Sequence, residues 1–183
     1  MTPDGVFDHQ ATLLKLLQQW HHPYAAEIGV ASGRTSEYLL KNHSGLRLWM
    51  VDRWDCVPGS RRQRSSYIAA KQTAADRTEF AADRRTIVHA SSAWAAATMV
   101  DGFFDLIFID AHHEYASVIE DMTVWWSRLR AGGVYCGHDI DSPKDKRGVW
   151  GVRKAVEEFC GERGLEFQVD KNTWVLIKPP TVK

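Results

Sequence analysis

The stretch that decides the fold is Ala26-Glu27-Ile28-Gly29-Val30-Ala31-Ser32-Gly33-Arg34-Thr35, which joins a short apolar run to an amphipathic one. This order predicts the end of a buried strand, a glycine turn and the start of a helix. Gly29 and Gly33 allow the backbone to pass close to a ligand, where a Cβ atom would collide. The free N–H groups at the start of the helix then favour a ligand that carries negative charge.

A second motif follows the glycine turn, after enough residues for one helix that connects two parallel strands. The apolar run from Leu46 to Val51 ends in Asp52, nineteen residues after Gly33 (52 minus 33). A carboxylate at the tip of a neighbouring strand can accept hydrogen bonds from both hydroxyl groups of a ribose. The glycine turn and Asp52 together therefore predict a site for a cofactor that contains a nucleoside.

The glycine spacing argues against a dinucleotide cofactor. A dinucleotide loop has the pattern G-x-G-x-x-G, in which the second glycine lets the backbone reach the pyrophosphate. Here Ala31 and Arg34 occupy positions where that pattern has further glycines. A nicotinamide-dependent oxidoreductase is therefore disfavoured.

The bulk composition fits a single globular α/β domain over residues 1–183. The 23 Lys and Arg residues balance the 23 Asp and Glu residues, so charge does not indicate a nucleic-acid partner. The three cysteines are scattered, which is typical of a reducing cytoplasm and not of a disulfide framework. No signal peptide and no apolar run of bilayer-spanning length is visible, so we expect a cytoplasmic protein without a membrane partner.

Strands alternate with helices along the chain, which predicts a Rossmann-like, doubly wound sheet of about seven strands. The expected parallel strands are 24–30, 46–51, 86–89, 104–110 and 134–137, and a C-terminal hairpin of 165–169 and 173–177 adds an antiparallel strand. The expected helices are 7–20 within an N-terminal segment 1–22, 36–42, 67–82, one that begins at Ser91 or Ser92, 116–129, and 149–160. Ala131-Gly132-Gly133 is expected to end the fifth of these helices, and 53–85 forms a longer connection on the substrate side.

Charged side chains fall where the expected strands end. Glu27, Asp52, Asp110 and the pair His138-Asp139 all stand at predicted carboxyl ends. Ligands of such sheets bind outside the carboxyl ends of the strands, so one cleft should collect these residues.

Two motifs carry a resemblance to a known family. The spacing E-x-G-x-x-x-G, from Glu27 to Gly33, is similar to motif I of class I S-adenosylmethionine (SAM) methyltransferases. Further along, the chain resembles the small O-methyltransferases of that class (methyltransferase family 24-like), whose signature reads I-D-[GA]-x-H-x-Y-x-x-V-x-x-D…W…L…G-G…G-H-D. The matching residues are Ile109, Asp110, Ala111, His113, Tyr115, Val118, Asp121, Trp125, Leu129, Gly132, Gly133, Gly137, His138 and Asp139.

The resemblance implies SAM as the cofactor and a hydroxyl group of a small molecule, such as a sugar or a natural product, as the methyl acceptor. It places Glu27 near the methionine amino group, where a carboxylate suits an ammonium, and Ser91 and Ser92 in the turn that borders the adenine. The cofactor-binding residues expected on this basis are Glu27, Gly29, Val30, Ala31, Gly33, Asp52, Arg53, Ser91, Ser92 and Asp110.

Catalysis is expected from Asp110, His113 and His138. A histidine can take up a proton near neutral pH, so His113 is a candidate general base, with a ligand role left open. Asp110 and Asp139 offer oxygen ligands that suit Mg²⁺, and His138 offers a ligand or a second base. Metal-dependent catechol-type relatives carry Asn or Asp after the second aspartate, whereas Ile140 stands here. Bracing of a loop is the alternative for each of these side chains.

Other functions stay open at this stage. The acceptor could be a nitrogen atom or a nucleotide, or the chain could bind SAM without catalysis as the partner of another protein. The oligomeric state is also open, because the apolar stripe of the N-terminal helix fits either its own sheet or a second copy.

Overall fold

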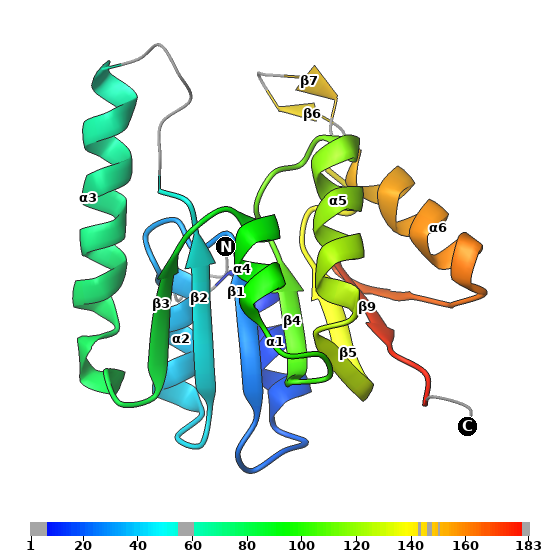
Figure 1. The fold of residues 1–183 in the computed structure, drawn as a ribbon, viewed down its shortest axis with the longest axis horizontal. Coiled ribbons are helices and arrows are strands. Elements are labelled where there is room, and N and C mark those ends of the chain that lie inside the picture. The colour runs from blue at the N-terminus through cyan, green and yellow to red at the C-terminus, as the bar shows by residue number, and fades with distance from the viewer. Residues whose placement is uncertain (1–6, 55–60, 143, 146–147, 150, 181–183) are drawn as a thin grey trace.

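The computed structural model describes residues 7–54, 61–142, 144–145, 148–149 and 151–180 of the chain (Figure 1). Positions 55–60 of the expected substrate-side connection lie outside the described residues. The elements, in chain order, are α1 (Asp8–Leu17), β1 (Tyr24–Ile28), α2 (Arg34–Asn42), β2 (Arg47–Asp52), α3 (Arg61–Arg77), the short 3-10 helix η1 (Glu79–Ala81), β3 (Arg85–His89), α4 (Ser92–Thr98), β4 (Phe104–Ile109), α5 (Tyr115–Trp126), β5 (Leu129–Gly137), β6 (Lys144–Asp145), β7 (Gly148–Val149), α6 (Val152–Arg163), β8 (Gln168–Asp170) and β9 (Thr173–Ile177).

The main sheet has seven strands in the order β3-β2-β1-β4-β5-β9-β8. Strands β1 to β5 pair in parallel, whereas β9 runs antiparallel to both β5 and β8. The predicted doubly wound sheet with an antiparallel C-terminal hairpin is therefore confirmed. Strands β6 and β7 form a separate small hairpin between β5 and α6.

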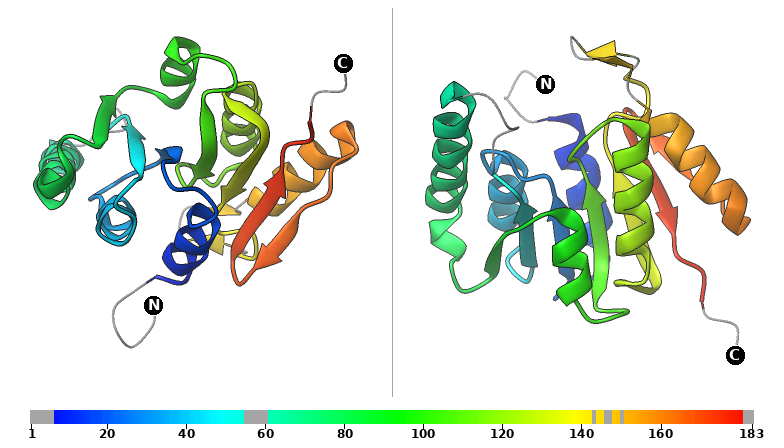
Figure 2. Two further views of the ribbon diagram at one scale, coloured as in Figure 1. Left: turned by 90° about the horizontal axis from the view of Figure 1, so that it is seen from below. Right: turned by 45° about the horizontal axis from the view of Figure 1, so that its top comes forward.

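Helices cover both faces of the sheet (Figure 2). Alternate residues of β4 face the two hydrophobic cores on opposite sides of the sheet. Ile107 and Ile109 pack with residues of α4, α5 and α6. Leu106 and Phe108 pack with residues of α1, α2 and α3. This alternation is the period of a strand that is buried on both sides. The N-terminal helix thus packs its apolar stripe on its own sheet, and its N-terminus lies at the carboxyl edge of the strands.

The boundary between α5 and β5 differs from the expected one. Helix α5 ends at Trp126, and residues 131–133 belong to β5 instead of closing the helix. The ammonium group of Lys178, beyond β9, donates to the carbonyl oxygens of Trp126 and Leu129 at 2.7 Å each. Glycine suits position 133 of β5 because this part of the strand lies close to β4. A Cβ on Gly133 would lie 3.0 Å from the Asp105 carbonyl oxygen.

Two other helices are shifted relative to the expected ranges. Helix α3 starts earlier than predicted and stops at Arg77, and α6 lies three residues later at both ends. Gly164, with φ of 61°, ends α6 in a left-handed C-cap. Within the described part of the chain, no helix combines the length and the apolar composition needed to cross a membrane.

Candidate active site at the carboxyl edge of the sheet

The glycine turn after β1 is shaped by contacts within the chain. Gly29 has φ of 97°, and a Cβ on it would lie 2.2 Å from the carbonyl oxygen of Asp110. Gly33 has φ of 76° at the N-cap of α2, and a Cβ there would lie 2.8 Å from Cα of Ala74. Both glycines are therefore required by the packing of the turn against β4 and α3, independently of any ligand.

Asp52 holds this turn in place. Its Oδ2 atom accepts hydrogen bonds from the N–H groups of Val30 at 2.9 Å and Ala31 at 2.8 Å, and Oδ1 accepts from Trp54 N–H at 2.8 Å. A carboxylate has about four acceptor positions, and three are used by N–H groups of the residues that the structure describes, which leaves room for a hydroxyl donor among them. The N–H groups of Val30 and Ala31 belong to the turn before α2, and their bonds to Asp52 fix the shape of the turn.

Trp54 is a site residue that the sequence did not reveal. Its side chain is buried, and its indole N–H donates to the Ala31 carbonyl oxygen at 2.8 Å. Ala31 itself has φ of 49°, a left-handed conformation that needs such support. The only signal in the sequence is the position of Trp54 two residues after Asp52, at the start of the expected substrate-side connection.

Glu27 is buried beneath the turn, with 3% of its surface exposed. Its Oε2 atom accepts a hydrogen bond from the Ser36 hydroxyl at 2.5 Å. Burial raises the pKa of Glu27 from 4.5 to about 8, and the Ser36 bond only partly offsets this rise. The side chain thus holds a proton at neutral pH when no cation accompanies it.

The turn before α4 is braced by two signature residues. Ser91 is the N-cap of α4 and accepts from Trp94 N–H, while Ser92 accepts from the indole N–H of Trp125 at 2.9 Å. Ser92 is also hydrogen-bonded to the carboxyl group of the buried Asp121. The Asp and Trp of the signature therefore fix this turn. Trp94, in the first turn of α4, is 61% exposed.

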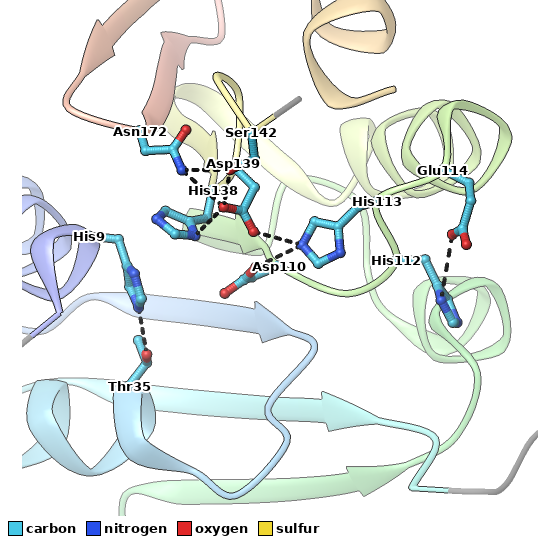
Figure 3. A network of polar contacts seen from close by, with 10 residues as sticks. All are labelled: His9, Thr35, Asp110, His112, His113, Glu114, His138, Asp139, Ser142 and Asn172. Atoms are coloured by element: carbon cyan, nitrogen blue, oxygen red, sulfur yellow. Dashed lines mark hydrogen bonds and ion pairs between the residues drawn. The ribbon is translucent and has the colours of Figure 1, made fainter. Parts of the chain in front are cut away.

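Four polar side chains converge after β4 and β5 (Figure 3). The Nε2 atom of His113 lies 3.6 Å from Oδ1 of Asp110 and 3.0 Å from Oδ2 of Asp139. The Nδ1 atom of His138 lies 3.4 Å from Oδ1 of Asp139. The neighbouring His112 points away toward Glu114 and is exposed. The structure thus brings the predicted catalytic and metal-binding residues together, with His112 outside.

Asp139 is oriented by residues that sequence reasoning missed. Its φ of 61° turns the side chain out of the strand direction. Its Oδ1 atom accepts from the Ser142 hydroxyl at 2.8 Å and from the Asn172 amide at 2.9 Å. Asn172 lies in the turn between β8 and β9, so the C-terminal hairpin supports the site.

The charges of this cluster are strongly coupled. Burial alone would lower the pKa of His113, but its hydrogen bonds to Asp110 and Asp139 outweigh burial and raise that pKa to about 9. Burial would raise the pKa of Asp139, but hydrogen bonds from His113, His138 and Ser142 hold it well below its usual range. In the ligand-free protein, His113 is therefore an imidazolium at neutral pH.

Helix α1 adds a residue to this edge. His9 is buried, its Nε2 atom is hydrogen-bonded to the Thr35 hydroxyl at 2.9 Å, and its ring centroid lies 4.5 Å from that of His138. Its ring also stacks on Phe108 at 5.6 Å. His9 thus connects the helix that follows the glycine turn to the end of β5, a link that no sequence pattern indicated.

The residues at this edge of the sheet fit the two groups that the resemblance implied, SAM and a divalent ion. SAM carries an ammonium and a sulfonium, and the carboxyl groups of Glu27, Asp52 and Asp110 lie around the turn. Glu27 is buried, and burial raises its pKa. Asp110, His113 and Asp139 each offer a ligand atom, all within 4.8 Å of one another, which fits a divalent ion. Arg53 is exposed beside Asp52.

The fold and the acids at its strand ends define a class I methyltransferase. The family model described as "Methyltransferase domain" (methyltransferase family 24) matches residues 26–140, which is more than half of the chain. The protein belongs to this methyltransferase family. A search of curated proteins gives no match.

Solved structures show the same fold. A protein from Staphylococcus aureus described as a caffeoyl-CoA O-methyltransferase is 14% identical with a TM-score of 0.72, over 94% of this chain and 85% of that one. TomG from Streptomyces achromogenes, an O-methyltransferase of tomaymycin synthesis solved with SAM, is 22% identical with a TM-score of 0.65, over 96% and 83% of the chains. An O-methyltransferase from Bacillus cereus, solved with S-adenosylhomocysteine (SAH), is 19% identical with a TM-score of 0.64, over 97% and 82%.

Proposed function

We propose that this methyltransferase transfers the methyl group of SAM to a hydroxyl group of a small molecule at the carboxyl edge of the sheet. The observation that carries the proposal is the contact between Gly29 and the backbone of Asp110, where a Cβ would lie only 2.2 Å from the carbonyl oxygen. This contact joins the turn expected to bind the cofactor to the polar cluster expected to receive the acceptor. The O-methyltransferase names of the structural neighbours support the same reaction.

The cofactor would lie over the glycine turn. We propose that Glu27 approaches the methionine ammonium, that the free acceptor position of Asp52 receives a ribose hydroxyl, and that Ser91 and Ser92 border the adenine. Val30, Ala31 and Arg53 complete the outline of this pocket. Pairing of Glu27 with an ammonium would favour its carboxylate form, because an adjacent cation lowers the pKa of an acid.

SAM supplies an activated methyl group, so the chain has to align the acceptor and deal with its proton. Alignment of the acceptor oxygen behind the methyl carbon contributes several orders of magnitude to the rate. Asp110 lies where the cofactor turn meets the cluster, so it is placed to orient the acceptor hydroxyl. The acceptor proton would pass to a side chain of the same cluster.

His113 is not ready to act as a general base in the ligand-free protein. Its pKa of about 9 means that it already holds a proton at neutral pH. His138 lies beside it, and its pKa is also raised, because the hydrogen bond to Asp139 outweighs burial. Asp110 and Asp139 would hold a divalent ion, which would supply the positive charge that polarises the acceptor hydroxyl.

The acceptor is proposed to be a sugar or natural-product hydroxyl. The segments that would shape its pocket follow the carboxyl ends of two strands: the 53–85 connection begins after β2, and the chain that leads to α6 begins after β5. We propose one catalytic domain over residues 1–183, with no nucleic-acid partner.

A release assay for SAH tests this function. Purified protein is incubated with SAM and a panel of sugars, phenols and amines, with and without a divalent ion, and SAH is quantified. We expect acceptor-dependent SAH with at least one hydroxylated compound, a loss of rate in Asp110→Asn, and no loss in His112→Gln, the exposed neighbour. Release with amines alone would contradict a hydroxyl acceptor.

A further inference from the structure

We propose that His113 is the third protein ligand of a divalent-cation site formed with Asp110 and Asp139, and that this site prefers first-row transition ions such as Mn²⁺ and Co²⁺ over Mg²⁺. The proposal deepens the function proposed above. It depends on that function only for the role of the ion in methyl transfer, because ion binding is measurable without SAM or acceptor.

The distances fit ligands of one ion. Ligand atoms at about 2.1 Å from an ion lie about 3.0–3.5 Å apart when they occupy adjacent positions. The Nε2 atom of His113 lies 3.0 Å from Oδ2 of Asp139 and 3.6 Å from Oδ1 of Asp110. All three ligand atoms lie within 4.8 Å of one another, so small rotations of side chains would complete the set.

The cluster is accessible yet partly enclosed. The side chains of Asp110 and His113 are each 24% exposed, and that of Asp139 is 15% exposed. An ion can therefore enter from solvent and keep positions for water or an acceptor oxygen. Such a partly open set is typical of a catalytic ion, whereas a structural ion is closed off by protein ligands.

Asp139 is held in the orientation that a ligand needs. Ser142 and Asn172 both donate to Oδ1, which leaves Oδ2 directed at His113. Hydrogen bonds of this kind orient metal ligands and contribute to affinity. Ile140, the next residue, is 2% exposed and packs in the core, so the third ligand has to come from another element. His113, in the segment between β4 and α5, is in place to supply it.

The chemistry of the ligands sets the preference for the ion. Mg²⁺ favours oxygen ligands in a near-octahedral set and dehydrates reluctantly. An imidazole nitrogen suits first-row transition ions, whose affinities rise from Mn²⁺ through Co²⁺. Two carboxylates with one imidazole should therefore bind Co²⁺ and Mn²⁺ more tightly than Mg²⁺.

Calorimetry of the metal-free protein with MnCl₂, CoCl₂ and MgCl₂, without SAM, tests the proposal. We expect one site per chain and at least about 10-fold tighter binding of Mn²⁺ than of Mg²⁺. His113→Gln should weaken Mn²⁺ binding by about 10-fold or more, because loss of a ligand costs at least as much as loss of a group that orients one. His112→Gln, the matched control on the adjacent exposed residue, should bind Mn²⁺ like the wild type.

Pulsed electron paramagnetic resonance of the wild-type Mn²⁺ complex gives a second readout that does not depend on the folding of a variant. We expect hyperfine coupling to a directly bound imidazole nitrogen. The proposal is overturned by the absence of that coupling, by equal affinities for Mn²⁺ and Mg²⁺, by no ion binding at all, or by wild-type affinity in folded His113→Gln. Mn²⁺ binding that depends on His113 in a protein that does not bind SAM would contradict only the proposed function.

Discussion

The imidazole of His9 is hydrogen-bonded to the hydroxyl group of Thr35 across 26 residues of sequence, with Nε2 and Oγ1 2.9 Å apart. This bond ties the N-terminal helix to the first turn of α2, directly after the glycine turn. The same ring packs against the ring of His138, with 4.5 Å between the two ring centroids. The N-terminal helix α1 therefore contacts the candidate active site through His9, and it also contributes to the hydrophobic core.

Two substitutions of His9 should separate its hydrogen bond from its packing. His9→Phe keeps an aromatic ring against Phe108 and removes the bond to Thr35, which should cost about 1 kcal/mol of unfolding free energy. His9→Ala also removes the packing and should cost about 3 kcal/mol. Urea unfolding measures both, with the exposed His21→Ala as a neutral control. Equal costs for the two variants would contradict a separate contribution from packing.

The buried Glu27 should make the ligand-free protein less stable as pH rises. Its pKa is about 8 in the fold and 4.5 as the ordinary value, so between these values the folded state holds a proton that the unfolded state has lost. Stability contributed by the protonated form is therefore full below pH 4.5 and falls toward pH 8, by at most about 1.4 kcal/mol per pH unit.

Glu27→Gln should remove this dependence and weaken SAM binding. Unfolding free energies of wild type and variant, measured from pH 5 to pH 8, should diverge, with the variant relatively more stable at pH 8. Calorimetry at pH 8 should show weaker SAM binding by the variant, because a neutral amide replaces a carboxylate beside an ammonium. Parallel pH profiles would argue against a raised pKa at Glu27.

The crowding at Gly33 can be separated from its backbone conformation. Gly33 and Gly164 both have left-handed φ angles, 76° and 61°, but a Cβ would lie 2.8 Å from Ala74 at the first and meets no atom within 4 Å at the second. Gly164→Ala should cost about 1 kcal/mol from conformation alone. Gly33→Ala should cost about 1–3 kcal/mol more, because α3 has to move. Equal melting temperatures of the two variants would exclude a tight contact with α3.

The coupling of His113 to the aspartates should be visible by nuclear magnetic resonance. In metal-free protein, the His113 ring should titrate near pH 9, because the two carboxylates stabilise its imidazolium form. Stability from this pairing is full below the ordinary pKa of 6.5 and is lost as pH rises through 9. Asp139→Asn should move the titration to lower pH. An unchanged midpoint in that variant would mean that Asp139 does not stabilise the imidazolium.

Patterns of local residues predicted the sheet and the acids at its edge. The apolar runs before Asp52 and Asp110 have the length of buried strands, and Glu27 lies within a third such strand. Parallel strands end at the same edge of a sheet, so the order of the strands along the chain predicted that these acids lie close together. The ends of the helices were less predictable, because the Trp126 carbonyl at the end of α5 accepts a hydrogen bond from Lys178, which lies 52 residues away. No local pattern contains such a partner.

The same reason explains which site residues were missed. Asn172 lies 33 residues from the Asp139 side chain that it orients, and His9 reaches Thr35 only after α1 has packed on the sheet. The sequence predicted that Gly29 and Gly33 make room for a ligand. In the structure, a Cβ on Gly29 would collide with the backbone of Asp110, and a Cβ on Gly33 would collide with Ala74. A sequence shows that a glycine has no Cβ, but it does not show which atoms of the fold pack against that position.

Calorimetry of the purified protein with SAM, and with NADH in a parallel titration, tests whether the turn after β1 binds SAM. We expect one SAM site per chain with micromolar affinity, weakened in Asp52→Asn, and no binding of NADH. Binding of NADH without SAM, or no binding of SAM with and without Mn²⁺, would contradict the assignment of this turn to SAM.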